Sequence, residues 1–387
     1  MKRIRAIIFL LLCTSLLSAQ TALYNGGNLR LHENAQMGLH TELINDAAWD
    51  NNLGLVGFYG NGRTLSGSVV PLFYDVEVVL NTTLRLTTGL DVANNLNFIT
   101  GNVATDRLDP GTHLTFVGDA FYVGESDLAK VDGYAAMTNK RSFIFPVGSA
   151  SELRPLALNA AETNLFAQCA YFLEDPNAPF SLPGPFDTDN VERDLGFVSN
   201  VEFWQLQGSV PSTITINWNP NSDMAALTAD AALIVPVGWS LSQNEWVSLG
   251  NTGFAGTLEQ GFVTSGTFVP NEYAIITLGV TRDALEPLDS DLFDLDNFYI
   301  SLNGDGINDA LIIPQLEQSP NNMVKIYDRF GLKVFEKQNY TNEFRGVSNI
   351  NNLVISREEG LPVGVYFYTV YMADLDLNYQ GFLYLSR

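Results

Sequence analysis

The chain has 387 residues, enough for two or three domains of about 150 residues each with substantial hydrophobic cores. It carries 43 Asp and Glu against 20 Lys and Arg, a net charge of −23, and such a polyanion repels phosphate backbones, which excludes nucleic acid as a partner. Only 16% of its residues are charged, against about 25% in ordinary soluble domains. Together with 32 glycines, this balance predicts a mainly β, multi-domain chain.

The first residues have the pattern of a secretory signal peptide. Three basic residues precede the apolar run 6–13, and the small residue Ala19 stands before Gln20. We expect residues 1–19 to be a signal peptide, recognised by the general export machinery and cut by signal peptidase between Ala19 and Gln20. Cys169 is then the one cysteine of the mature chain, in an apolar segment that predicts a buried, inert thiol.

Residues 20–190 are expected to form a β-rich passenger region. Between residues 65 and 103, short apolar runs alternate with polar residues and are broken by Gly, Asn and Thr. The recurring positions, six residues apart in two series, are Leu84, Leu90 and Leu96, and Leu86, Val92 and Phe98. This pattern is typical of the stacked rungs of a small β-solenoid, and ordinary sandwich strands remain the alternative.

The next two segments are expected to be a domain and a linker. Residues 191–281 contain regularly spaced short strands with turn signals between them, which predicts a β-sandwich. Residues 282–296 are expected to be an acidic linker, because 286–296 hold five carboxylates in eleven residues that repel one another.

Residues 297–387 contain several specific blocks in a fixed order. They begin with Asn303-Gly-Asp-Gly-Ile-Asn-Asp309 and continue with Lys325-Ile-Tyr-Asp-Arg-Phe-Gly331 and Leu361-Pro-Val-Gly-Val-Tyr-Phe-Tyr368. The runs on either side of 328–331 alternate in polarity, which predicts a hairpin, and 365–371 reads as a central strand. A compact antiparallel β-sandwich domain is expected.

This tail resembles the gliding-motility-associated C-terminal domain, the type B sorting domain of the type IX secretion system of Bacteroidota. The resemblance implies recognition by the type IX outer-membrane components after export to the periplasm, and delivery to the cell surface or the medium. The residues of the matching motif are Asn303, Gly304, Asp305, Gly306, Asn308, Asp309, Arg329, Gly331, Pro362, Gly364, Tyr366 and Tyr368. More loosely, 145–148, 154–156, 203–206 and 215–218 resemble blocks in passengers that carry such sorting domains, which implies surface β modules.

The first block also allows a test for a metal site. Asn303, Asp305 and Asp309 match the third, fifth and ninth positions of a calcium loop, but Ser301 and Ile312 stand where the first and the bidentate twelfth ligand would be. We expect no metal, and a tight turn stabilised by Asn, Asp and Gly instead.

The passenger shows no catalytic or cofactor motif. Its three histidines have no metal-ligand spacing, no nucleophile elbow occurs, and we expect the abundant carboxylates to lie on a solvated surface. We expect a structural or adhesive surface protein without a cofactor, not an enzyme. The alternatives are a secreted polysaccharide-active enzyme or a protein that binds an extracellular glycan; an outer-membrane β-barrel ranks last.

Overall fold

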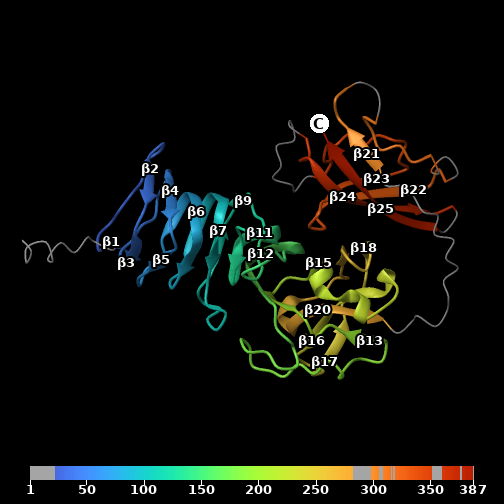
Figure 1. Ribbon diagram of the computed structural model, residues 1–387, viewed down its shortest axis with the longest axis horizontal. Coiled ribbons are helices and arrows are strands. Elements are labelled where there is room, and N and C mark those ends of the chain that lie inside the picture. Colours follow the sequence, from blue (N-terminus) through green and yellow to red (C-terminus); the bar gives the residue numbers. More distant parts are fainter. Residues whose placement is uncertain are drawn as a thin grey trace, which may run out of the picture. The chain divides into compact units, whose positions relative to one another are not determined.

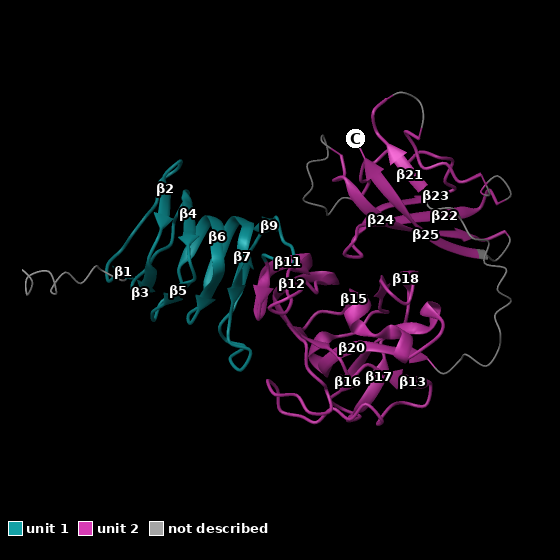
Figure 2. Cartoon of the chain, viewed as in Figure 1, with its two compact units in different colours: residues 1–129 teal, residues 130–387 magenta. Residues whose placement is uncertain are grey.

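The structure is a computed structural model that describes residues 22–281, 298–304, 308–314, 316, 319–350, 360–374 and 377–386. The predicted signal peptide 1–19, its cleavage site at Ala19 and Gln20, and the predicted linker 282–296 lie outside these residues. The fold is mainly β, with 53% of residues in strands and 4% in helices, as the composition predicts (Figure 1). Two compact units, 1–129 and 130–387, divide the chain (Figure 2).

The first unit contains nine strands within its described residues, 22–129. They are β1 (Ala22–Asn25), β2 (Gln36–Leu39), β3 (Glu42–Asn45), β4 (Leu55–Gly60), β5 (Arg63–Ser66), β6 (Leu72–Leu86), β7 (Leu90–Ala104), β8 (Leu114–Val117) and β9 (Phe121–Val123). All of their pairings within this unit are parallel, which decides between the two sequence interpretations in favour of the solenoid. One ladder runs β2–β4–β6–β7–β9 and a second begins β1–β3–β5–β6.

The rungs repeat about every 20 residues. Val56 pairs with Val76, and Val76 pairs with Leu96, so these three fully buried side chains form one inward column. The six-residue spacing seen in the sequence is therefore not the rung period. It marks successive inward positions along a single coil, because residues 87–89 separate Leu86 at the end of β6 from Leu90 at the start of β7.

Buried asparagines tie successive coils together at one corner. Asn25 donates to Asn45 Oδ1 at 2.6 Å, and Asn45 donates to the carbonyl of Val69 at 2.8 Å. Both asparagines are 2% exposed or less. Each side chain satisfies backbone or amide groups that the corner removes from the parallel ladder.

The second unit begins with a region of eleven strands. They are β10 (Val131–Asp132), β11 (Tyr134–Phe145), β12 (Leu156–Phe172), β13 (Leu195–Val198), β14 (Phe203–Gly208), β15 (Ser212–Trp218), β16 (Ile234–Ser240), β17 (Glu245–Ser248), β18 (Gly253–Gly256), β19 (Gly261–Thr264) and β20 (Tyr273–Thr281). Four single-turn 3₁₀ helices lie at Pro220–Ser222, Met224–Ala226, Ala231–Leu233 and Pro270–Glu272.

The long strands β11 and β12 pair with each other, and two ladders of strands branch from β12. In one ladder, the second half of β12 pairs with β14, which is followed by β20, β16 and β17. The first half of β12 pairs with β15, which is followed by β19 and β18. Aromatic and aliphatic side chains fill the core, and Cys169 is fully buried and free, with burial raising its thiol pKa.

A buried ion pair lies inside this region. Arg154 and Glu202 form a salt bridge with side chains 1% and 2% exposed, and Tyr171 donates to Glu202 Oε2 at 2.6 Å. Glu152, 7% exposed, accepts hydrogen bonds from Asn219 and Asn221. The expectation that the carboxylates are solvated is therefore wrong for Glu152 and Glu202.

The blocks noted in the sequence meet at this ion pair. Arg154 Nη2 also donates to the carbonyl of Asn217 at 3.0 Å, and Trp204 Nε1 donates to the carbonyl of Arg154 at 2.9 Å. The guanidinium lies 5.7 Å from the ring centroid of Tyr171 and 5.4 Å from that of Trp204, which partly offsets its desolvation. Sequence spacing could not reveal this, because Arg154 lies just before β12, Glu202 just before β14, and Asn217 in β15.

The C-terminal part of the second unit is a separate five-stranded sheet. Its strands are β21 (Phe298–Ser301), β22 (Asn322–Tyr327), β23 (Lys333–Gln338), β24 (Gly364–Met372) and β25 (Leu377–Ser386), in the order β21-β25-β24-β22-β23. All neighbours are antiparallel except β21 and β25, which are parallel. The predicted hairpin and the central position of β24 are confirmed.

Among the residues that the structure describes, no helix has the length and apolar character needed to cross a membrane.

Candidate functional site in the C-terminal domain

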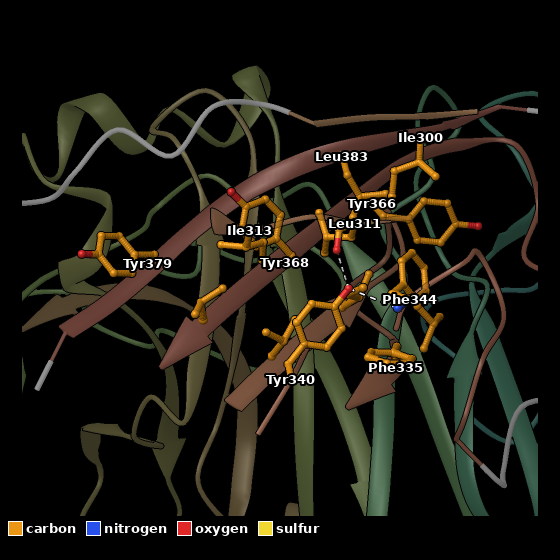
Figure 3. Packing of buried hydrophobic residues seen from close by; sticks show 14 of the residues in the cluster. Ile300, Leu311, Ile313, Phe335, Tyr340, Phe344, Tyr366, Tyr368, Tyr379 and Leu383 are labelled. Carbon is orange, nitrogen blue, oxygen red and sulfur yellow. Dashed lines mark hydrogen bonds between the residues drawn. The ribbon is translucent and has the colours of Figure 1, made fainter. Parts of the chain in front are cut away.

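The core of the C-terminal domain lies between the sheet and a layer of non-strand segments. One face of the sheet contributes Tyr366, Tyr368 and Leu383, and the facing layer contributes Leu311, Ile313, Leu316, Tyr340, Phe344 and Leu361. Figure 3 shows Leu311, Ile313, Tyr340, Phe344, Tyr366, Tyr368 and Leu383 packed together. In the described residues the second layer of the expected sandwich is thus built from loops.

Tyr340 connects the two ends of the loop layer. Its hydroxyl donates to the carbonyl of Leu311 at 2.7 Å and accepts from the backbone N–H of Phe344 at 3.1 Å (Figure 3). The residue is 1% exposed, and burial raises the pKa of its hydroxyl well above the ordinary value. Tyr340 is absent from the motif residues chosen from the sequence, because its acceptor, the carbonyl of Leu311, is 29 positions away.

The first motif block forms a turn directly after β21. The N–H of Ser301 donates to the carbonyl of Asn308 at 2.8 Å, and the N–H of Gly304 donates to Asp309 Oδ1 at 3.1 Å. Gly304 and Asn308 have φ values of +76° and +56°, which glycine and asparagine tolerate best. Asn303 is exposed beside them.

Asp305 and Gly306, which belong to the candidate metal loop of the sequence, lie outside the described residues. Elsewhere in the described parts of the chain, no group of three His, Cys, Asp or Glu side chains is placed to hold a metal ion. The hydrogen bond from Gly304 to Asp309 supports the tight-turn interpretation of the block.

The second motif block forms the β22–β23 hairpin. Asp328 Oδ1 accepts from the N–H groups of Phe330 and Leu332, both at 2.9 Å, and the N–H of Gly331 donates to the carbonyl of Asp328. Gly331 has a φ of +80°, and Arg329 lies over the Phe330 ring at 4.6 Å. Asp328, which the list of motif residues omits, therefore shapes this turn more than Arg329 does.

The third motif block forms the turn before β24 and the first half of that strand. Tyr366 is 4% exposed, and its hydroxyl donates to the carbonyl of Pro362 at 2.7 Å. Gly364 begins the strand at a φ of +154°. Tyr368 is fully buried, with its ring centroid 5.5 Å from that of Phe298. Tyr366 and Tyr368 thus belong to the core of the domain, whereas Asn303, Gly304, Arg329 and Pro362 are exposed.

Comparison with known proteins gives one match. Residues 293–385 match the family model described as CHU_C Type IX secretion signal domain. No curated protein and no solved structure matches the chain. Such a domain implies interaction with the type IX secretion machinery and export to the cell surface or the extracellular space. The C-terminal part of this chain, from 293 to 385, is therefore a CHU_C type IX secretion signal domain, the C-terminal sorting domain of the gliding motility-associated family.

Proposed function

We propose that the protein is a structural or adhesive surface protein whose C-terminal domain directs its passage across the outer membrane. The part of this proposal that concerns export is supported by the family match at 293–385. In this proposal a signal peptide at 1–19 is removed at Ala19 and Gln20 by signal peptidase after general export. The type IX outer-membrane components then recognise the C-terminal domain and carry residues 20–281 outward.

The passenger half of the proposal is supported by the solenoid surface. Parallel rungs bring Tyr59, Glu77 and Asn97 of β4, β6 and β7 to one outer face, together with His40, which directly follows β2. The His40 and Tyr59 rings stack with centroids 5.3 Å apart, and Tyr59 donates to Glu77 Oε1 at 2.9 Å. An ordered outer face of aromatic, carboxylate and amide groups suits attachment to an extracellular surface.

Glycan binding is the second candidate. A shallow cavity of about 150 Å³ in the first unit is lined by Arg85, Thr87, Thr105, Asp106, Asp109 and Thr112. Asp109 accepts from Thr112 Oγ1 at 2.8 Å and from the N–H of Gly111 at 3.1 Å, so its carboxylate shapes the loop. These lining groups are suited to sugar hydroxyls.

Two measurements test the proposal. Deletion of residues 293–387 should leave the passenger in the periplasm of a type IX-competent host, whereas the full chain reaches the surface or medium. The exported protein should bind at least one ligand in a screen of immobilised glycans and matrix proteins. If the protein hydrolyses a polysaccharide or peptide and Asp106→Asn or Asp109→Asn abolishes this activity, the passenger is an enzyme and the proposed adhesive role is wrong.

A further inference from the structure

The sheet of the C-terminal domain has a second face, opposite the core, that lacks charge on three strands. Side chains alternate along these strands between buried and more exposed positions. The outward positions are Tyr299 and Ser301 of β21, Val365, Phe367, Thr369 and Tyr371 of β24, and Asn378, Gln380, Phe382, Tyr384 and Ser386 of β25. We call this set the outer face. In a strand exposed to water on one side, these positions are ordinarily polar or charged.

The centre of the exposed area is aromatic. Tyr299 and Tyr384 are opposite each other on β21 and β25, and their rings stack with centroids 6.0 Å apart and planes within 9°. Tyr384 is in turn opposite Val365 on β24. Tyr299, Tyr384 and Phe382 are 54%, 40% and 41% exposed. A contiguous exposed apolar patch of this kind marks an interaction surface.

The exposed patch adjoins an apolar contact between Phe262 of β19 and the outer face. Within the second unit, Phe262 of β19 lies 4.9 Å from the ring centroid of Tyr327 and 5.4 Å from that of Phe367. Phe262 is fully buried there, and Tyr327 and Phe367 are 7% and 8% exposed. Phe382 is the direct cross-strand neighbour of Phe367. The outer face therefore already accepts an apolar side chain at one edge of the exposed patch.

The polar positions near the centre of the outer face are uncharged. Gln380 is opposite Thr369 and two positions from Phe382. A partner that suits this face is therefore apolar and uncharged.

Charge argues against a second copy of the chain as the occupant. Residues 20–296 carry 33 acidic and 10 basic residues, whereas 297–387 carry 10 and 7. Two passengers brought together would repel each other, because most of the net charge of −23 lies on them. The nearly neutral C-terminal domain suits a different protein.

We propose that the outer face, centred on Tyr299, Phe382 and Tyr384, is the surface through which the C-terminal domain docks onto an apolar, uncharged surface of the type IX outer-membrane machinery. This inference rests on the proposed export function. The motif residues Tyr366 and Tyr368 then maintain the fold, and the exposed rings on the opposite side of the sheet make the contact.

The test compares export of the full chain with that of a triple variant, Tyr299→Thr, Phe382→Thr and Tyr384→Thr. Threonine retains a preference for strands, so the sheet should persist while the apolar patch is lost. We expect the exported fraction to fall at least about tenfold, as when aromatic anchors are removed from an interface, with folded protein accumulating in the periplasm. Ile312→Thr is the matched control: Ile312 is 53% exposed in the same domain but outside the outer face, and its export should be unchanged.

The following outcomes are decisive. Export of the folded triple variant at the wild-type level overturns the inference while leaving the export function intact. Failure of the wild-type chain to leave the cell overturns the proposed function itself. If the triple variant does not fold, Tyr384→Thr alone is compared with Tyr384→Phe; reduced export of the first and normal export of the second support the inference, and equal export contradicts it. Self-association of the purified wild type that is lost in the variant would assign the face to a second copy.

Discussion

The hydroxyl of Tyr340 donates a hydrogen bond to the carbonyl of Leu311 across 29 positions of the chain. It also accepts from the N–H of Phe344 and is almost completely buried. Tyr340→Phe leaves both backbone groups unsatisfied, and the expected loss is about 1–3 kcal/mol of unfolding free energy for the C-terminal domain. Chemical denaturation of the purified protein measures it.

The matched control is Tyr299→Phe. Tyr299 also hydrogen-bonds through its hydroxyl, to Ser386 Oγ at 2.7 Å, but it is 54% exposed, so water replaces the partner and the change should be small. Equal effects of Tyr340→Phe and Tyr299→Phe would contradict the role given to burial.

The ion pair of Arg154 and Glu202 predicts strong coupling between the two side chains. Glu202→Gln or Arg154→Met alone leaves one charge buried without its partner, and each should cost about 3–5 kcal/mol of stability. The double variant should lose much less than the sum of the single losses, because no isolated charge remains. A double-mutant cycle by denaturant unfolding measures the coupling. Additive losses would show that the two groups act independently.

His113 predicts a pH dependence of stability. Burial is the largest influence and lowers its pKa from 6.5, and the nearby carboxylates of Asp91 and Asp109 oppose the shift. As the pH falls below 6.5, the unfolded chain binds the proton before the folded chain does, so the unfolding free energy decreases. Between about pH 7 and about pH 5, His113→Gln should lose less stability than the wild type.

Asp91 is expected to change the unfolding free energy with pH in the opposite direction to His113. Burial raises its pKa above 3.8, so the folded chain binds this proton first and the contribution to stability increases as the pH falls toward that value. An identical profile for His113→Gln and the wild type would contradict the burial argument.

The position of Gly101 in β7 is expected to require glycine. Its φ is +90°, and an added Cβ would lie 2.7 Å from the carbonyl oxygens of both Leu80 and Thr82. Gly101→Ala should therefore destabilise the first unit by at least about 1 kcal/mol through backbone strain and this clash. Gly27→Ala, where an added Cβ meets nothing within 4 Å, is the control in a thermal unfolding comparison.

Local pattern predicted the hairpin at 328–331, because the contacts between β22 and β23 are close in sequence. Strand β24 was predicted from its own run of apolar and aromatic residues, although its partner β22 is about 45 positions away. The rung period could not be predicted from Leu84, Leu90 and Leu96, because inward positions along one coil and across coils have the same residue types. Glu202 gave no signal of burial either, since its cation, Arg154, is 48 positions away.

The central claim is that the C-terminal domain is sufficient to direct export. The most direct measurement places a reporter protein behind a signal peptide, fuses residues 293–387 to its C-terminus, and follows its location in a type IX-competent host. The account predicts that the reporter reaches the cell surface or the medium, and that the same reporter without these residues stays in the periplasm. Retention of the fusion in the periplasm, while another CHU_C signal domain exports the reporter in parallel, would contradict the account.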